Sequence, residues 1–321
     1  MGEPLVSVVV NFYNQAHLVP RALRSVVGQT YGNLDIVVVD DGSKDDVEHA
    51  VQQFGDARIR FFKQENSGVA TARNLGVREA KAQYIAFLDG DDVFLPTKIE
   101  EQMDQMLKLD VKVIASGCYF VTKRGIVIDR RICGKFKTNP GDSITNFPKI
   151  NPSLLIYDRA VFDELGGFPQ SFRIGEDGMF NRMVFKKFSI VSLPQPLVLK
   201  EKDDLSGKSR RMLASYDETL KSLHQKLDCM ESALSIEDYK IYAYKLKMSN
   251  LCGLLSVGNM KAAKRWYRDV LNSSLPSSGS ALVRFSVLTE LNVYLVAMKI
   301  RNVFSFFRYL PVTIVHRSRW E

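Results

Sequence analysis

The sequence has few cysteines and histidines and no long uncharged apolar run. Its four cysteines include no C-x-x-C pair, which argues against a disulfide framework or a zinc site and predicts a reducing compartment. No apolar run of about 18 residues free of charge occurs, so no membrane-spanning helix is expected. No basic segment followed by an apolar run opens the chain, so no signal peptide is predicted. The composition, 45% hydrophobic and 25% charged, is that of one large or two smaller globular domains.

The net charge of +8 is concentrated near the C-terminus. Residues 261–321 hold ten Lys and Arg side chains against three Asp and Glu side chains. A basic block of this kind predicts an anionic partner, such as lipid, nucleic acid or a polyanionic substrate, unless it is only a solvated face. No motif that reads nucleic acid accompanies the block, so a nucleic-acid partner is not expected.

Apolar, β-branched runs alternate with helical patterns over residues 1–92. Alternation at this spacing predicts βαβ units and a mostly parallel sheet, and the near-continuous apolar strands predict helices on both of its faces. The fold class predicted for this region is therefore α/β and Rossmann-like. The expected strands are 6–10, 34–39, 59–62 and 84–88, and the expected helices are 17–29, 47–54 and 69–80.

The pattern is more mixed after residue 92 and becomes helical after about residue 210. A breaker at 273–280 precedes a last expected helix at 281–309, which is apolar and aromatic apart from a narrow polar stripe. We therefore predict an α/β region at 1–209, with halves 1–92 and 93–209, and a helical region at 210–321. Between residues 93 and 200, the expected strands are 111–121, 125–132 (strand or hairpin) and 154–157, and the expected helices are 96–109, 158–165 and 177–187.

An acidic cluster, Asp89-Gly90-Asp91-Asp92, follows the expected strand 84–88. Three carboxylates this close repel one another unless a cation or bound protons offset their charge. The carboxyl end of a strand in an α/β sheet is also where ligands usually bind. The cluster is either a solvated acidic turn before a helix or a site for Mg²⁺ or Mn²⁺ bridging a nucleotide diphosphate.

Polar and aromatic residues also follow the first two expected strands. Asn11-Phe12-Tyr13-Asn14 could stack on and hydrogen-bond a nucleobase, although packing in a core or turn is the alternative. Asp40-Asp41-Gly42-Ser43 places two carboxylates on the same rim, where a carboxylate can accept from a base N–H or a ribose hydroxyl. The alternative for Asp41 is a helix cap.

Two further segments carry charges at expected helix starts. Gly68 opens a helix whose N-terminal amides favour anions, and Arg73 near its first turn could pair with a phosphate or lie on the surface. Glu176 and Asp177 open a later helix. There a carboxylate is either a cap and dipole partner or a general base that deprotonates an acceptor hydroxyl.

Taken together and in this order, the motifs resemble the large family 2 of inverting, nucleotide-sugar-dependent glycosyltransferases, which have the GT-A fold. The resemblance runs from about residue 6 to about residue 206. Each part is weak alone, but the ordered set is specific. The matching parts are 6–14, Gln29-Thr30-Tyr31, Val39 to Ser43, Asn66-Ser67-Gly68, 72–76, Phe87 to Asp92, Gly166-Gly167-Phe168 and Glu176-Asp177.

The resemblance implies a role for each matching residue. A nucleoside diphosphate, most often of uridine, would lie at the strand ends with Arg73 near its diphosphate. A metal, Mn²⁺ or Mg²⁺, would sit at the acidic cluster with Asp91 as the main ligand. Asp177 would be the base, with Glu176 beside it orienting the acceptor. The donor-binding set is Phe12, Tyr13, Asn14, Asp40, Asp41, Arg73, Asp89 and Gly90, and the metal set is Asp91, Asp89 and Asp92.

Two departures from the family pattern stand out. Many relatives have Pro where this chain has Asn11, and many have His in an H-x-x-S stretch where this chain has Asp203-Asp204-Leu205-Ser206. The second departure puts a third protein contact to metal or diphosphate in question. No Gly- and Lys-rich loop follows the first strand, which argues against a nucleotidyltransferase. A non-enzymatic binding or scaffold protein of the same fold is the other alternative.

The resemblance also implies a setting for the enzyme. We expect a bacterial protein at the cytoplasmic face of the membrane that builds a surface polysaccharide or glycan on a saccharide, lipid-linked or protein acceptor. Residues 281–321 would then lie in the membrane interface, where apolar burial and anionic lipid both favour such helices. Packing on the catalytic region or on a second copy in a homodimer is the alternative.

Overall fold

The computed structural model describes residues 2–122, 126–131, 137–139, 150–172, 175–201, 215–231 and 259–266, with six further positions between 239 and 254. Its strands are β1 (Val6–Phe12), β2 (Leu34–Asp40), β3 (Ile59–Lys63), β4 (Tyr84–Asp89), β5 (Asp92–Phe94), β6 (Val113–Val121), β7 (Val127–Arg131), β8 (Leu155–Asp158) and β9 (Ile190–Glu201). Its helices are η1 (Ala16–Leu18), α1 (Val19–Val27), α2 (Val47–Gln52), α3 (Val69–Glu79), α4 (Lys98–Leu109), η3 (Pro152–Leu154), α5 (Ala160–Leu165), α6 (Glu176–Lys187), α8 (Tyr216–Glu231) and α10 (Met260–Trp266).

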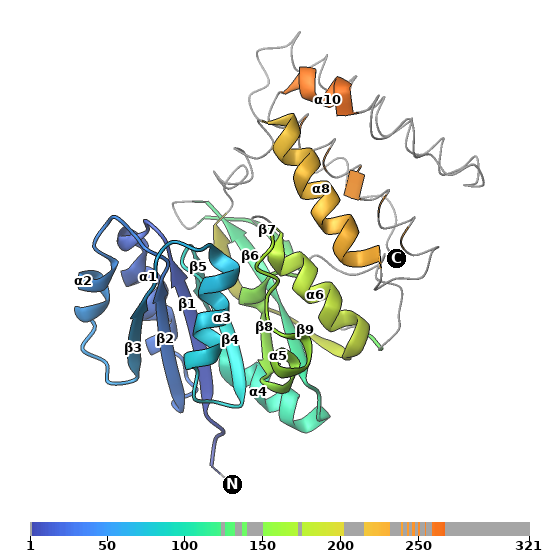
Figure 1. The fold of residues 1–321 in the computed structure, drawn as a ribbon. Helices are drawn as coiled ribbons and strands as arrows, with labels where there is room; N and C mark the ends of the chain where they lie inside the picture. Colours follow the sequence, from blue (N-terminus) through green and yellow to red (C-terminus); the bar gives the residue numbers. More distant parts are fainter. Residues whose placement is uncertain are drawn as a thin grey trace. The chain divides into compact units, whose positions relative to one another are not determined.

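The strands form one mixed sheet in the order β3-β2-β1-β4-β8-β6-β9-β5, with β7 paired to β6 (Figure 1). The first four strands are parallel. Every residue of β1 and β2 is buried, as expected for β-branched strands covered on both faces. The α/β, GT-A-like fold class predicted from the sequence is confirmed.

The second half of the sheet mixes directions. β8 runs antiparallel to both β4 and β6, whereas β6 and β9 run parallel to each other. The hairpin expected near 125–132 is confirmed, because β7 pairs antiparallel with β6. Neither β5 nor β9 was predicted from the sequence. The short β5 pairs antiparallel with the end of β9, and this pairing brings residues 92 and 200 together.

Five aromatic rings pack between the sheet and helices α5 and α6. Phe168 lies 4.3 Å from Phe180 of α6 and 5.3 Å from Phe87 of β4, measured between ring centroids. Tyr157 of β8 and Phe162 of α5 complete the cluster. Because all five rings are buried, they fix α6 against the strands β4 and β8.

Two compact units, 1–262 and 263–321, divide the chain. The division expected near residue 209 stays a prediction. The helix expected at 281–309 and Asp203 both lie outside the described residues. Among the helices that are described, none has the length and apolarity needed to cross a bilayer.

Helix α3 lies directly on β1, where glycine allows a close approach. A Cβ atom at Gly76 would come within 2.2 Å of Val9 Cγ1. We expect Gly76→Ala to lower the free energy of unfolding by about 1–3 kcal/mol, because the added methyl group overpacks the contact with β1. Urea denaturation followed by circular dichroism measures this change.

The matched control is Gly32→Ala, because nothing lies within 4 Å of the Cβ position there. That variant should unfold with a free energy within about 0.5 kcal/mol of the wild-type value. A Gly76→Ala protein as stable as the control would contradict the packing of α3 on β1.

Candidate active site

The carboxyl ends of β1, β2 and β4 lie side by side at one edge of the sheet. In the parallel register, Phe12 is opposite Asp40 and Asn11 is opposite Asp89. β1 has β2 on one side and β4 on the other, so the strand order reverses here. Ligands of open α/β sheets bind outside the carboxyl ends at such a switch point.

The loops after β1 and β2 hold each other. Asn14 donates its backbone N–H to Ser43 Oγ at 2.9 Å, and its Oδ1 accepts from the backbone N–H of Lys44 at 2.8 Å. Asn14 has a positive φ of 53°, a conformation that Asn tolerates better than most residues. The structure thus gives Asn14 a structural task, while its predicted contact with the donor stays untested.

Of the two aromatic residues at the end of β1, Phe12 and Tyr13, Tyr13 is the accessible one. It is 46% exposed, whereas Phe12 is buried. The Phe12 ring lies beneath Gly90, whose Cβ would come within 2.7 Å of the ring. Gly90 therefore allows the acidic turn to rest on Phe12, and Tyr13 presents the ring that a nucleobase can reach.

Both aspartates at the end of β2, Asp40 and Asp41, are engaged within the protein. Asp41 Oδ1 accepts from the backbone N–H of Ser67 and Oδ2 from that of Gly68, each at 2.9 Å. Asp41 thereby fastens the loop that begins α3, instead of capping a helix within its own turn. Asp40 is fully buried, accepts from the Ser43 N–H and lies 3.5 Å from Lys63 Nζ. Their predicted contacts with base and ribose stay untested.

Asn11 is a buried amide at the end of β1. Neither its Oδ1 nor its Nδ2 has a hydrogen-bond partner among the residues that the structure describes. Val9, two residues earlier, faces α3 at Gly76, so the alternation of a strand places Asn11 on that same face, beside Asp89. An unpaired buried amide is costly, and it fits a ligand that both donates and accepts hydrogen bonds.

Arg73 bridges the acidic cluster and the helix α6. Its guanidinium is buried and pairs with Asp89 at 2.7 Å and with Glu176 at 3.0 Å. Burial alone would lower the pKa of Arg73, but the charges of Asp89, Glu176 and Asp177 outweigh burial and raise it. The predicted alternative of a surface arginine is therefore wrong. A diphosphate would have to contact Arg73 at a part of the guanidinium that Asp89 and Glu176 do not occupy.

The ion pair with Arg73 also determines the protonation state of Asp89. Burial opposes its ionisation, but Arg73 and then Lys200 hold the pKa of Asp89 below its ordinary value. Asp89 is therefore an ionised carboxylate in the folded protein. Its other oxygen, Oδ2, accepts from Asn151 Nδ2 at 3.4 Å, which leaves part of the carboxylate for a ligand.

Asp91 is the carboxylate of the cluster that solvent can reach. It is exposed and makes no ion pair with any residue in the described part of the chain. Partial burial of its carboxyl group, followed by the charges of Asp92 and Asp89, raises the pKa of Asp91 to about 6. A divalent cation would relieve this repulsion, so the group fits a metal ligand.

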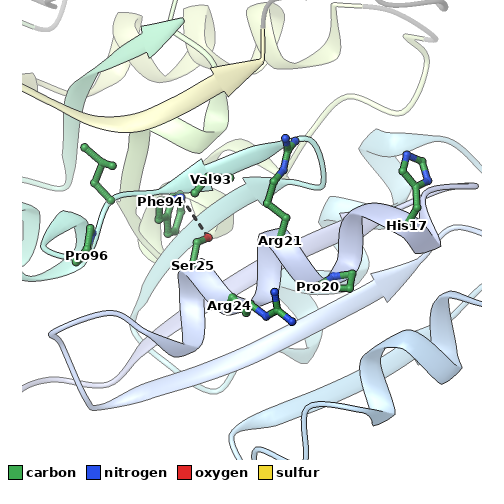
Figure 2. Close-up of a pocket in the computed structure, with 9 residues that line it drawn as sticks. His17, Pro20, Arg21, Arg24, Ser25, Val93, Phe94 and Pro96 are labelled. Carbon is green, nitrogen blue, oxygen red and sulfur yellow. Dashed lines mark hydrogen bonds between the residues drawn. The ribbon is translucent and has the colours of Figure 1, made fainter. Parts of the chain in front are cut away.

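The backbone of Asp91 is anchored from α1. Arg21 donates from Nη2 to the Asp91 carbonyl oxygen at 2.6 Å and from Nη1 to Glu201 Oε2 at 2.7 Å. Arg21 lies at a surface depression of about 550 Å³ that is lined also by His17, Arg24 and Phe94. Figure 2 shows the side chains of these lining residues. The depression borders the acidic turn and contains none of the predicted site residues.

Asp92 differs from Asp91 in burial and pairing. Its carboxylate is buried and makes an ion pair with Lys200 Nζ. Burial alone would lower the pKa of Lys200, but Asp92, Asp89 and Asp91 raise it. Burial outweighs the charge of Lys200 and raises the pKa of Asp92. The geometry nevertheless argues against Asp92 as a metal ligand, because its carboxylate is buried and already pairs with Lys200.

The oxygen ligands of the acidic cluster suit magnesium or manganese bound together with a diphosphate. Within the described residues, no group of three or more His, Cys, Asp and Glu side chains converges as a complete metal site. Mg²⁺ and similar hard cations need only one or two protein carboxylates when phosphate oxygens and water supply the other ligands. Asp91 and the Oδ2 atom of Asp89 could supply these one or two carboxylate ligands.

Helix α6 presents the proposed base. Asp177 is half-buried, and its Oδ1 accepts from the Gly178 N–H at 2.7 Å, whereas Glu176 is buried and held by Arg73. Lys226 of α8 reaches the same helix start, with Nζ 2.9 Å from the Cβ position of Gly175. Burial and then Arg182 lower the pKa of Lys226. Of the two carboxylates, Asp177 is the one open to an acceptor.

The sequence model of "Glycosyl transferase family 2" matches residues 7–187. The chain belongs to this family. An uncharacterized glycosyltransferase of Rickettsia felis is 35% identical over 182 residues, 56% of this chain and 29% of the relative. A protein of Escherichia coli, the UDP-Glc:alpha-D-GlcNAc-diphosphoundecaprenol beta-1,3-glucosyltransferase WfgD, is 35% identical over 128 residues, 40% of this chain and 51% of the relative. The family 2 chain thus spans from under a third to about half the length of these relatives.

Solved structures agree on the fold. The mannosyltransferase PcManGT of Pyrobaculum calidifontis, solved with GDP-Man and Mn²⁺, superposes with a TM-score of 0.55 over 95% of this family 2 chain and 89% of its own. The two sequences are 17% identical, so the likeness concerns the fold alone.

The carboxylates of the site and Arg73 could be found in the sequence, but the other basic residues around them could not. Arg21, Lys200 and Lys226 were not singled out, because each lies far along the chain from its partner and no motif marks it. A lysine at the end of a largely apolar run, as at residue 200, is the only signal that the sequence offered.

The raised pKa of Asp91 indicates that its ionised form, which metal binding needs, lowers the stability of the folded protein. Above pH 6 the ionised carboxylate is less favourable in the folded than in the unfolded chain. We expect Asp91→Asn to raise the free energy of unfolding by about 1 kcal/mol at pH 7.5, after allowance for solvent screening, while metal-dependent nucleotide binding is lost. The gain should vanish near pH 4, where the folded-state carboxyl group is protonated.

Urea denaturation at the two pH values measures the stability, and calorimetry measures the binding. Asp104→Asn, on an exposed face of α4, is the matched control and should change neither quantity. An Asp91→Asn protein that is less stable than the wild type at pH 7.5 would contradict this account of the cluster.

Proposed function

We propose that the chain is an inverting glycosyltransferase that moves a sugar from a nucleotide diphosphate to a hydroxyl acceptor. The observation that carries this proposal is the Arg73 bridge, because it joins the acidic cluster at the end of β4 to the start of α6. One buried contact thus sets the donor-binding carboxylates beside the candidate base.

The donor would enter at the switch point of the sheet. Tyr13 offers an exposed ring for the base, and Asn11 offers an unpaired amide at the strand end. The name of the Escherichia coli relative indicates a UDP-linked sugar, and the structure from Pyrobaculum calidifontis holds GDP-Man. We favour UDP because of the higher sequence identity of the first relative.

Asp91 would hold Mn²⁺ or Mg²⁺ together with the diphosphate, with Asp89 at the edge of the same site. A bound divalent ion would stabilise the charge that develops on the leaving diphosphate. The manganese in the Pyrobaculum calidifontis structure is consistent with this assignment. Asp92 would have no direct contact with the ion, because Lys200 already pairs with it.

Asp177 would act as the general base. Its carboxylate accepts the proton of the acceptor hydroxyl while the acceptor oxygen attacks the anomeric carbon. The bond from that carbon to the diphosphate oxygen breaks in the same step, and the configuration inverts. Glu176 would stand beside Asp177 and orient the acceptor, while its ion pair with Arg73 fixes the start of α6.

The acceptor and the setting follow from the relatives. The name of the Escherichia coli protein indicates a diphosphoundecaprenol-linked acceptor, which fits synthesis of a surface polysaccharide at the cytoplasmic face of a membrane. Residues 281–321 would contribute through their basic and apolar side chains, either at the membrane interface or in a homodimer.

Calorimetric titration tests the proposal. Uridine diphosphate should bind in the presence of Mn²⁺ and not in the presence of chelator, and guanosine diphosphate provides the comparison. Failure of both nucleotides to bind with metal would contradict the proposed donor site and favour a non-enzymatic protein of the same fold.

Asp177→Asn separates binding from chemistry. The variant should bind Mn²⁺ and nucleotide as the wild type does, and it should lose about 10²–10⁴-fold in turnover because no base accepts the acceptor proton. The measurement is release of nucleoside diphosphate from the sugar donor that a screen of UDP- and GDP-sugars selects.

Asp163→Asn, an exposed carboxylate on α5, is the control and should keep full turnover. If Asp177→Asn retained wild-type turnover, the base would have to be another group.

A further inference from the structure

Two basic side chains from distant parts of the chain lie against the acidic cluster. Asp89 is paired with Arg73 of α3, and Asp92 is paired with Lys200 of β9. Asp91 alone has no ion pair in the part of the chain that the structure describes. Three carboxylates within four residues therefore behave unequally, because two carry a built-in counter-ion and one does not.

Lys200 is placed by the sheet. The register of β5 on β9 sets Asp92 directly opposite Lys200, so the pair belongs to the backbone pairing of the two strands. The side chain of Lys200 is 19% exposed and that of Asp92 is 2% exposed. An ammonium group held in this way cannot swing into solvent without breaking a buried ion pair.

The charge of Lys200 acts on the whole cluster. It interacts with Asp92 first, then with Asp89 and Asp91. A cation at this position repels a second cation, so it weakens the attraction that the cluster exerts on free metal ions. A purely structural ion pair would only hold β5 to β9 and would leave metal affinity unchanged.

We propose that Lys200 is a positioning residue. By pairing with Asp92, it leaves Asp91 as the carboxylate that binds a single divalent ion, and this ion enters the site together with the nucleotide diphosphate. This inference rests on the proposed function and specifies that the metal ion and the nucleotide bind together. Lys200 pairs with Asp92, as Arg73 pairs with Asp89, so Asp91 is the carboxylate of the cluster that has no counter-ion among the described residues before nucleotide binds. One carboxylate holds Mn²⁺ weakly, and the diphosphate oxygens supply the remaining ligands.

The test is a titration of free Mn²⁺ into the full chain, read by electron paramagnetic resonance, without nucleotide and with uridine diphosphate. The wild type should bind Mn²⁺ weakly alone and far more tightly with nucleotide. In Lys200→Met, the affinity for Mn²⁺ alone should rise about tenfold, because Asp92 then adds its charge to the site.

Two variants isolate the cause. Lys200→Arg keeps the charge and should behave as the wild type does. The double variant Lys200→Met with Asp92→Asn removes both charges and should return the metal-alone affinity to within about twofold of the wild-type value. A folded Lys200→Met protein whose metal-alone affinity equals that of the wild type would overturn the proposal.

Asp92→Asn decides the matter if Lys200→Met fails to fold. That variant retains the lysine without its partner, so Mn²⁺ affinity in the presence of nucleotide should fall about tenfold. An unchanged affinity would overturn the proposal. Failure of the proposed function is distinguishable, since it would appear in the wild type as an absence of nucleotide binding with metal.

Discussion

The site depends on one buried ion bridge, in which Arg73 of α3 holds Asp89 with one nitrogen and Glu176 with the other. A guanidinium suits this task because its planar donors reach two carboxylates at once and it stays charged when buried. A buried Glu176 and a half-buried Asp89 without this cation would be strongly unfavourable. The bridge therefore couples the end of β4 to the start of α6, and with it the candidate donor site to the candidate base.

Fixed cations divide the carboxylates of the site by task. Arg73, Lys200 and Arg21 act on Asp89, on Asp92 and on the backbone of Asp91, respectively. Each cation comes from a different element, so α3, β9 and α1 together hold one short turn. The carboxylates left open, Asp91 and Asp177, are the two for which a ligand or a proton-accepting role is proposed.

Much of the fold and of the site could be predicted from the sequence, because the signals were local. The β-branched runs of β1 and β2 correctly predicted the parallel strands, and the polar and acidic residues that end them do lie at one edge of the sheet. β9 was missed because the exposed Pro194 and Gln195 interrupt its buried run, and a proline in an apolar run argues against a strand. The pair of Lys200 with Asp92 depends on β9 and was missed with it. Long-range pairs such as the one between α3 and α6 leave no periodic trace in the sequence.

The role of the Arg73 bridge is best measured by the free energy of unfolding of Arg73→Met, compared with the triple variant Arg73→Met, Asp89→Asn and Glu176→Gln. Arg73→Met should lose about 3–5 kcal/mol, because the buried Glu176 and the half-buried Asp89 are left without their cation, and the triple variant should recover most of this loss. An Arg73→Met protein within about 1 kcal/mol of the wild type, or a triple variant no more stable than the single one, would contradict the claim that this bridge holds the site together.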